Sequence, residues 1–163
     1  MNPPNTSREE IMRVSRKIVS EKGLPALNMR ALAKECGIAL GTLYNYYSDK
    51  DELVVAAIES VWQDILEKSA PDSGVSFSQY VTQTYAHIIE KLKDYPDFLA
   101  AHSISVAGSV KGKARGMMER CFGKIRSELH EVLQNDKNVD RSVFSDIFCE
   151  ENLIEHVLDN III

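Results

Sequence analysis

Hydroxyl, amide and ammonium groups are concentrated in one stretch of the chain, LGTLYNYYSDK. Thr42, Tyr44 and Tyr46 carry hydroxyls that can bind phosphate oxygens, and the Asn45 amide can pair with the edge of an adenine. Lys50 stands near the expected start of a helix, where a cation and free backbone N–H groups together bind phosphate. These residue types at this spacing are typical of a surface that binds DNA.

Two short helices are needed to present these side chains. Asn28 is a suitable N-cap for the first helix, and Gly37 ends it, because glycine adopts a left-handed backbone conformation without a side-chain clash. The second helix is expected over residues 40–47, with Leu43 held against the first helix and Gly41 leaving room at its start. Such a pair forms a helix-turn-helix, whose second helix lies in the major groove of DNA.

The rest of the chain also predicts helices, with almost no strands, so we expect an all-α fold. Ser7 begins a capping box at the start of one helix, and Gly23 and Pro25 end that helix. Apolar residues at helical spacing predict further helices at about 49–69, 76–95, from 96, through 117–132 and from 141 onward. Gly112 and Gly116 either precede the helix that contains 117–132 or lie within it.

The last expected helix begins near Arg141 and carries a broad apolar surface, to which Phe144, Ile147 and Phe148 contribute. The chain then ends in isoleucines at 161–163, with no capping glycine and no polar tail. Apolar helix ends of this kind are seldom exposed to water. We expect either that these residues are buried against a partner or that the chain is cut short of its true end.

Charge is divided unevenly along the chain. The whole chain has 19 Lys and Arg against 24 Asp and Glu, a net charge of −5. Residues 1–50 hold eight Lys and Arg against five Asp and Glu, a net charge of +3, which leaves −8 for residues 51–163. Because an acidic body is repelled by phosphate, DNA is expected to approach the amino-terminal end only.

Composition excludes several classes of protein. With 44% hydrophobic and 26% charged residues, the 163-residue chain has enough apolar material for a core, which excludes disorder as its main state. No apolar run approaches the roughly 20 residues of a membrane span. Residues 1–20 lack the apolar segment of a signal peptide, so we expect a cytoplasmic protein with no membrane contact.

Motifs for catalysis, nucleotide binding and metal binding are missing from the sequence. Cys36, Cys121 and Cys149 are widely spaced and are expected to be reduced thiols. We therefore expect no catalytic residues, no metal ligands and no cofactor, and a protein that is not an enzyme. An all-helical enzyme with an incidental helix-turn-helix is the least favoured interpretation.

The run from Asn28 to Leu53, NMRALAKECGIALGTLYNYYSDKDEL, resembles the TetR/AcrR family of bacterial transcriptional regulators. The family pattern reads roughly T-x-R-x-I-A-x-x-A-G-V-S-x-G-T-L-Y-x-Y-F-x-x-K-E-x-L, and the likeness covers about residues 7–56. The resemblance implies an all-helical homodimer with an amino-terminal DNA-binding domain. It also implies a carboxy-terminal helical bundle that binds a small ligand and dimerises through its last two helices.

The resemblance divides the chain into a helix-turn-helix domain at 1–48 and a ligand-binding and dimerisation domain at 49–163, with 49–69 as the connecting helix. Residues that match the family's DNA-contacting positions are implied to bind DNA. These are Asn28 and Lys50 for phosphate, Thr42, Tyr44 and Tyr46 for groove edges or phosphate, Leu40, Gly41 and Asn45 for bases, and Arg30. The alternative interpretation makes the tyrosines plain core aromatics.

Three positions depart from the family pattern. Tyr47 replaces the usual Phe and is implied to lie in the core. Asn28 replaces the usual Thr but caps a helix equally well. Ala39 replaces the usual Ser, which removes a cap worth about 1 kcal/mol and a phosphate contact.

The body carries weaker signals for a ligand. Aromatic, histidine and methionine side chains could line a cavity between helices, where such bundles usually hold ligands. The candidates are Trp62, Tyr85, His87, Phe98, His102, Met118 and Phe122, with Tyr80, Met117 and Cys121 as further ones. For each residue, ordinary core packing is the alternative interpretation.

Together these patterns predict a repressor that leaves a palindromic operator when a small ligand binds. Two modules on a homodimer would place their recognition helices ~34–36 Å apart. A ligand that favours a different spacing would weaken DNA binding by linkage. The alternative is a DNA-binding regulator without a small ligand, controlled by a protein partner that docks on residues 161–163.

Overall fold

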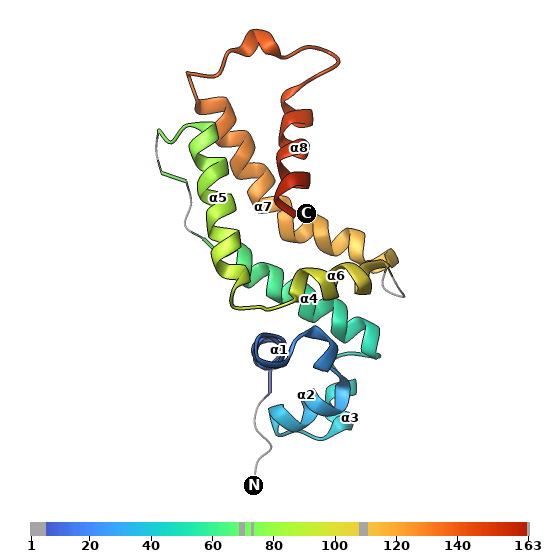
Figure 1. Cartoon of the computed structure of the whole chain (residues 1–163). Helices are drawn as coiled ribbons and strands as arrows, with labels where there is room; N and C mark the ends of the chain where they lie inside the picture. The colour runs from blue at the N-terminus through green and yellow to red at the C-terminus, as the bar shows by residue number, and fades with distance from the viewer. Residues whose placement is uncertain (1–5, 69–70, 73, 108–110, 163) are drawn as a thin grey trace.

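A computed structural model of the chain describes residues 6–68, 71–72, 74–107 and 111–162. Every regular element in these ranges is helical, which confirms the expected all-α fold. The amino-terminal helices form one end of the molecule, and the carboxy-terminal helices stand at the other end (Figure 1). No helix in the described ranges is both long and apolar enough to cross a bilayer.

The amino-terminal end is built from α1 (Arg8–Lys22), a 3-10 turn η1 (Leu24–Ala26), α2 (Met29–Cys36) and α3 (Leu40–Tyr44). The Ser7 side chain accepts a hydrogen bond from the Glu10 N–H and caps α1, as the sequence predicts. The Asn28 side chain caps α2 in the same way, accepting from Ala31 N–H at 3.0 Å. These caps place the helix starts where their first N–H groups find acceptors.

The remaining helices are α4 (Lys50–Leu66), α5 (Phe77–Leu92), α6 (Phe98–Ala107), α7 (Lys111–Asn135) and α8 (Glu150–Ile162), with a 3-10 turn η2 (Arg141–Val143) before α8. Helix α4 contacts α1 on one side and α5 and α7 on the other, so it joins the two ends of the molecule (Figure 1). One apolar core runs through both ends, and Trp62 on α4 is 1% exposed within it.

Several helix boundaries differ from the expected ones. Helix α3 ends at Tyr44 rather than residue 47, because the N–H groups of residues 46 and 47 both donate to the Leu43 carbonyl and close a turn. Helices α4 and α5 end three residues early, at Leu66 and Leu92. Helix α7 begins at Lys111, so both Gly112 and Gly116 lie within this helix rather than before it.

The expectation of one last helix from Arg141 is wrong. Helix α8 begins only at Glu150, and the Asp140 side chain instead caps η2 by accepting from Ser142 N–H at 2.9 Å. Ser145 N–H donates to the Phe148 carbonyl at 2.8 Å and closes a further turn. Short polar side chains thus compete with the helix for backbone groups, and this leaves Ile147 93% exposed instead of buried.

The end of the chain is only partly described. The Ile161 side chain is half-buried and packs against the core. Ile163 and the Ile162 side chain lie outside the described residues. The part of the terminal run that the structure describes is therefore in contact with the chain's own helices.

Replacing Gly37 tests the turn between α2 and α3. Gly37 has φ 67° and ψ 29°, the left-handed region, and a Cβ added there would meet nothing within 4 Å. We expect Gly37→Ala to lower the free energy of unfolding by about 1–2 kcal/mol, because only the backbone conformation is penalised. Gly37→Asn should lose less, since asparagine tolerates this region. Urea unfolding measures both changes in free energy. If Gly37→Asn lost as much stability as Gly37→Ala, this explanation would be contradicted.

Candidate functional site

Helix α3 is anchored from one side and open on the other. Leu43 is 0% exposed and fixes the helix against α2, while Gly41, Thr42, Tyr44 and Asn45 are exposed. The Tyr44 side chain is 47% exposed, so it is not the plain core aromatic of the alternative interpretation. The short helix therefore presents a hydroxyl, a phenol and an amide outward from a rigid support.

The other residues implied to bind DNA lie on neighbouring elements. Asn28 and Arg30 are exposed at the start of α2, Lys50 is exposed at the start of α4, and Leu40 is half-buried. Thus the nine residues lie on α3, in the two positions that follow it (Asn45 and Tyr46), and at the starts of the two helices that flank it in the chain. Ala39 is the N-cap of α3 and makes no side-chain hydrogen bond there, as the sequence predicts.

Tyr46 has a role that sequence reasoning missed. Its hydroxyl donates to the Thr6 carbonyl at 2.5 Å, and its own carbonyl accepts from Arg8 Nη2 at 2.8 Å. The Arg8 guanidinium also lies 5.0 Å from the centre of the Tyr47 ring, which is 2% exposed. The segment after α3 therefore holds the start of α1 in place, and Tyr47 is a core residue as expected.

Unpaired cations surround α3. Arg30, Lys34 and Lys50 are exposed, and none forms an ion pair within the described part of the chain. Lys17 and Lys22 on α1, in contrast, form ion pairs with Glu21 and Glu35, which belong to the same amino-terminal helices. Arg30, Lys34 and Lys50, on the helices next to α3 in the chain, are thus available to an external anion.

The start of α4 is a capped helix terminus. Asp49 accepts from Glu52 N–H at 2.7 Å, and the Glu52 carboxylate accepts from the N–H and the hydroxyl of Ser48 at 2.7 and 2.8 Å. The hydrogen bond from the Ser48 N–H is the main reason that the pKa of Glu52 lies below its usual value. This reciprocal capping fixes the first turn of α4, on which Lys50 stands.

Four of the seven ligand candidates meet in the body. The Trp62 ring lies edge-on to Phe98 at 5.6 Å, to His102 at 5.8 Å and to Phe122 at 5.2 Å, measured between ring centres. Phe98 also stacks on His102 at 5.8 Å. We call these four residues of α4, α6 and α7 the aromatic cluster. Met118 is half-buried next to it along α7.

Tyr85 and His87 do not join the aromatic cluster. The buried face of α5 is formed by Tyr80, Thr84 and Ile88, which recur every four residues. Tyr85 falls one position off this stripe and is 50% exposed. The expectation that Tyr85 lines a cavity is therefore not supported by its position, while His87 is half-buried.

Two nitrogen atoms of the aromatic cluster lack partners. Trp62 Nε1 and His102 Nε2 are buried and form no hydrogen bond with the described residues. Burial lowers the pKa of His102 below its usual value of 6.5, so its imidazole is neutral near pH 7. Unsatisfied polar atoms are costly inside a protein, and a ligand or water that bonded them would remove that cost.

The neutral His102 predicts a pH dependence of stability. A histidine whose folded pKa is depressed binds its proton more readily in the unfolded chain, so stability falls as the pH drops below the unfolded pKa of about 6.5. We expect the unfolding free energy to decrease from about pH 7.5 to about pH 5.5, and His102→Gln to reduce that decrease. Urea unfolding at both pH values measures it, and an unchanged decrease in the variant would contradict this assignment.

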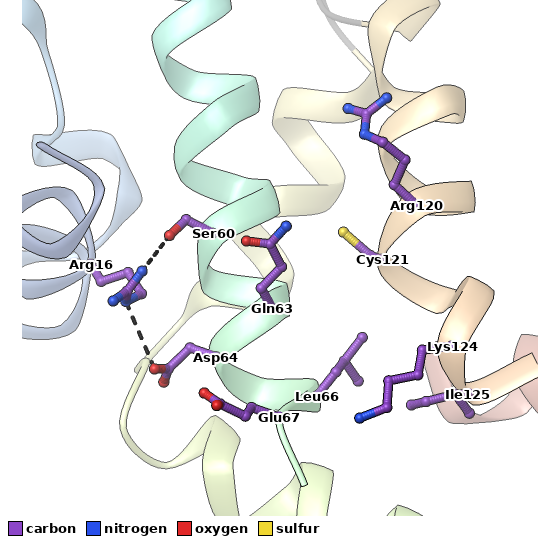
Figure 2. Close-up of a pocket in the computed structure, with 10 residues that line it drawn as sticks. All are labelled: Arg16, Ser60, Gln63, Asp64, Leu66, Glu67, Arg120, Cys121, Lys124 and Ile125. Carbon is purple, nitrogen blue, oxygen red and sulfur yellow. Dashed lines mark hydrogen bonds and ion pairs between the residues drawn. The ribbon is translucent and has the colours of Figure 1, made fainter. Parts of the chain in front are cut away.

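A polar cleft of about 390 Å³ lies between α1, α4 and α7 (Figure 2). Arg16 reaches into it from α1 and binds Ser60 and Asp64 on α4, while Arg120 on α7 forms a two-bond ion pair with Glu59 at 2.7 and 2.8 Å. Sequence reasoning missed this cleft because its partners are far apart in the chain.

The cleft has little reactive character. Burial raises the pKa of the Cys121 thiol to about 12, so the thiolate that a nucleophile or metal ligand requires is not formed near pH 7. Among the described residues, no group of three or more His, Cys, Asp and Glu is placed to hold a metal ion.

Comparisons with known proteins give one family model and several relatives. The family model described as bacterial regulatory proteins, tetR family, matches residues 11–57, the segment that contains α2, α3 and most of α1. The amino-terminal segment of the chain therefore matches this family. An uncharacterized HTH-type transcriptional regulator of Haemophilus influenzae is 33% identical over 95 residues, which are 56% of this chain and 50% of that protein.

Further relatives match over shorter lengths. The HTH-type transcriptional regulator UidR of Escherichia coli K12 is 32% identical over 79 residues, which are 48% of this chain and 40% of UidR. The chain thus spans half or less of the length of these curated relatives.

Solved structures share the fold over nearly the whole chain. The crystal structure of BioQ with its natural double-stranded DNA operator matches 96% of this chain and 82% of that chain, with a TM-score of 0.61 and 17% identity. A possible TetR family transcriptional regulator from Streptomyces coelicolor A3(2) matches 96% of this chain and 68% of its own, with a TM-score of 0.59 and 16% identity. The helical body therefore has the same fold as in these proteins.

Proposed function

We propose that this chain is a tetR-family, sequence-specific DNA-binding transcriptional regulator that inserts α3 into the major groove. The observation that carries the proposal is the exposed face of α3, supported by buried Leu43 and flanked by the unpaired cations Arg30, Lys34 and Lys50. Such an arrangement combines base reading on the helix with phosphate contacts beside it. The relative UidR is an HTH-type transcriptional regulator, and BioQ was solved with its DNA operator.

We divide the chain by role at the start of α4. Residues 1–48 bind DNA, with base contacts from Leu40, Gly41 and Asn45 and backbone or groove contacts from five further implied residues, and Lys50 adds a phosphate contact from the first turn of α4. Residues 49–163 form the body, in which 49–69 includes α4 and joins it to the DNA-binding part. The net charges of +3 for residues 1–50 and −8 for residues 51–163 support the assignment of DNA binding to the amino-terminal part.

The regulator acts as a homodimer on a palindrome. Leu153, Val157 and Ile161 recur every four residues along α8 and are half-buried, beside the fully buried Ile154 and Leu158. This leaves a partly exposed apolar stripe that a second copy can cover. A dimer then places two copies of α3 on successive half-sites.

The ligand binds at the aromatic cluster, and we propose that it is a neutral, largely apolar molecule with one hydrogen-bonding group. Trp62 Nε1 can donate to it, and neutral His102 can bond it through Nε2. Aromatic side chains favour a planar apolar partner. A ligand that prefers the conformation with low DNA affinity acts as an inducer, so the regulator is a repressor.

Selection of duplexes from a random DNA pool at about 150 mM salt tests the function, because non-specific phosphate binding is weak there. We expect a palindrome to be enriched. If the same sample sediments as a dimer and enriches no sequence, the proposed function is wrong. A monomer that enriches only a single half-site contradicts the homodimer instead.

A further inference from the structure

We propose that the Asp64 carboxylate positions the DNA-binding part on the body, because donors from both sides bind it. Arg16 approaches from α1, and Tyr95 approaches from the turn between α5 and α6. Asp64 is then a positioning residue that sets the angle of α3 relative to α4. This inference rests on the proposed DNA-binding function and adds to it the residues through which the body controls that function.

The contact on the side of α1 spans one turn of α4. Arg16 Nη1 donates to the Ser60 hydroxyl at 2.5 Å, and Arg16 Nε lies 3.7 Å from Asp64 Oδ1 (Figure 2). Ser60 is 4% exposed, while the Arg16 and Asp64 side chains are 30% and 31% exposed. Within the described residues this is the ion pair that connects residues 1–48 to the body. The guanidinium is therefore held at two points, which fixes its direction as well as its distance.

The contact on the side of the body leads to the aromatic cluster. Tyr95 is 6% exposed, and its hydroxyl donates to Asp64 Oδ2 at 2.9 Å. Its ring lies 6.2 Å from that of Phe98, the first residue of α6. Phe98 stacks on His102, so a rotation of α6 at the aromatic cluster would move Tyr95. Packed side chains and hydrogen bonds thus run without a gap from the proposed ligand site to α1.

The turn that carries Tyr95 has a defined backbone. Asp97, between Tyr95 and Phe98, has φ 60°, the left-handed region that few non-glycine residues adopt. This conformation sets the direction in which α6 leaves the turn. A change in the position of α6 is therefore passed to Tyr95 through a turn that cannot bend freely.

Loss of these polar contacts should alter orientation rather than folding. Helix α1 also packs on α4 through apolar residues, and α6 contacts η1. Partly exposed ion pairs contribute modestly to stability, typically below 1 kcal/mol. Without Asp64 the amino-terminal helices therefore stay folded and attached, but they lose the contact that selects one angle.

Operator spacing measures this angle directly. We would prepare the selected palindrome with its half-sites moved by one base pair in either direction, and a duplex with a single half-site. For the wild type we expect a preference for the selected spacing. For Asp64→Asn, Arg16→Gln and Tyr95→Phe we expect that preference to fall by about five-fold, with unchanged affinity for the single half-site. Arg16→Lys retains the positive charge, so it should keep more of the spacing preference than Arg16→Gln does.

Two controls separate positioning from stability. Arg13→Gln removes the ion pair between Arg13 and Glu10, 2.6 Å long, which lies within α1 and does not reach the body. This variant should leave the spacing preference unchanged. The double variant Arg16→Gln/Tyr95→Phe should lose less than the sum of its single losses, because both residues act through Asp64. Additive losses would show that they act independently and would overturn the inference.

The outcomes distinguish the two proposals. If the wild type enriches no operator, the proposed function fails and the inference fails with it. If the wild type discriminates between spacings and Asp64→Asn does so equally, only the inference is overturned. The same follows if Asp64→Asn loses thermal stability and single half-site affinity in proportion, because that pattern indicates a structural role alone.

Discussion

The double variant Tyr44→Ala/Lys50→Ala is expected to bind the selected operator about 100-fold more weakly than the wild type. Both side chains are exposed beside the reading face of α3, and a dimer loses two copies of each contact. The slope of log affinity against log salt should fall by about two, because each Lys50 that leaves a phosphate removes about one unit. Fluorescence anisotropy of a labelled duplex across a salt series measures both quantities.

A matched variant controls for exposure and charge. Tyr85 is 50% exposed, close to the 47% of Tyr44, and Lys93 has a side chain that is 67% exposed, but both belong to α5 or its C-cap. Tyr85→Ala/Lys93→Ala should keep the wild-type affinity and salt slope. Equal losses in the two double variants would mean that the DNA-binding surface has been placed on the wrong helices.

Trp62→Ala is expected to lower the free energy of unfolding by about 3–5 kcal/mol. The indole is 1% exposed and contacts three other rings, so its removal leaves a cavity where α4, α6 and α7 meet. Domains of this size have only about 5–15 kcal/mol of net stability. Urea unfolding followed by circular dichroism measures the loss.

Trp62→Phe serves as the comparison for Trp62→Ala. It keeps most of the apolar volume and removes the buried Nε1 that has no hydrogen-bond partner among the described residues. It should therefore lose much less stability than Trp62→Ala. If Trp62→Ala lost under about 0.5 kcal/mol, the range of exposed surface substitutions, the aromatic cluster could not be the centre of the body.

The amino-terminal helices could be predicted from the sequence because their signals are local. The Asn28 side chain caps α2 by accepting from the Ala31 N–H, three positions away, and Gly37 ends α2 in the left-handed conformation that glycine favours. The apolar Leu43 then fixes which side of α3 is buried. The bonds of Asn28 and Gly37 join residues fewer than six positions apart, so residue type and spacing were sufficient to predict them.

The missed features depend on contacts between distant residues or on competing local bonds. Arg16 and Asp64 are 48 positions apart in the sequence, so no local pattern joins them. Helical spacing also placed Ile147 on a helix, although Ser145 and its neighbours satisfy the backbone in a turn. Tyr85 lies off the buried face of α5, which residue type alone does not reveal.

Selection of duplexes with an altered reading helix tests the central claim, that α3 reads bases in the major groove. Asn45 is exposed at the carboxyl end of α3, and its replacement should not disturb the fold. We predict that Asn45→Ala enriches the wild-type palindrome with relaxed preference at one symmetric pair of positions, each relaxed by about 1–3 kcal/mol. An unchanged consensus for Asn45→Ala, and for Leu40→Ala beside it, would contradict the claim that α3 is the helix in contact with the bases.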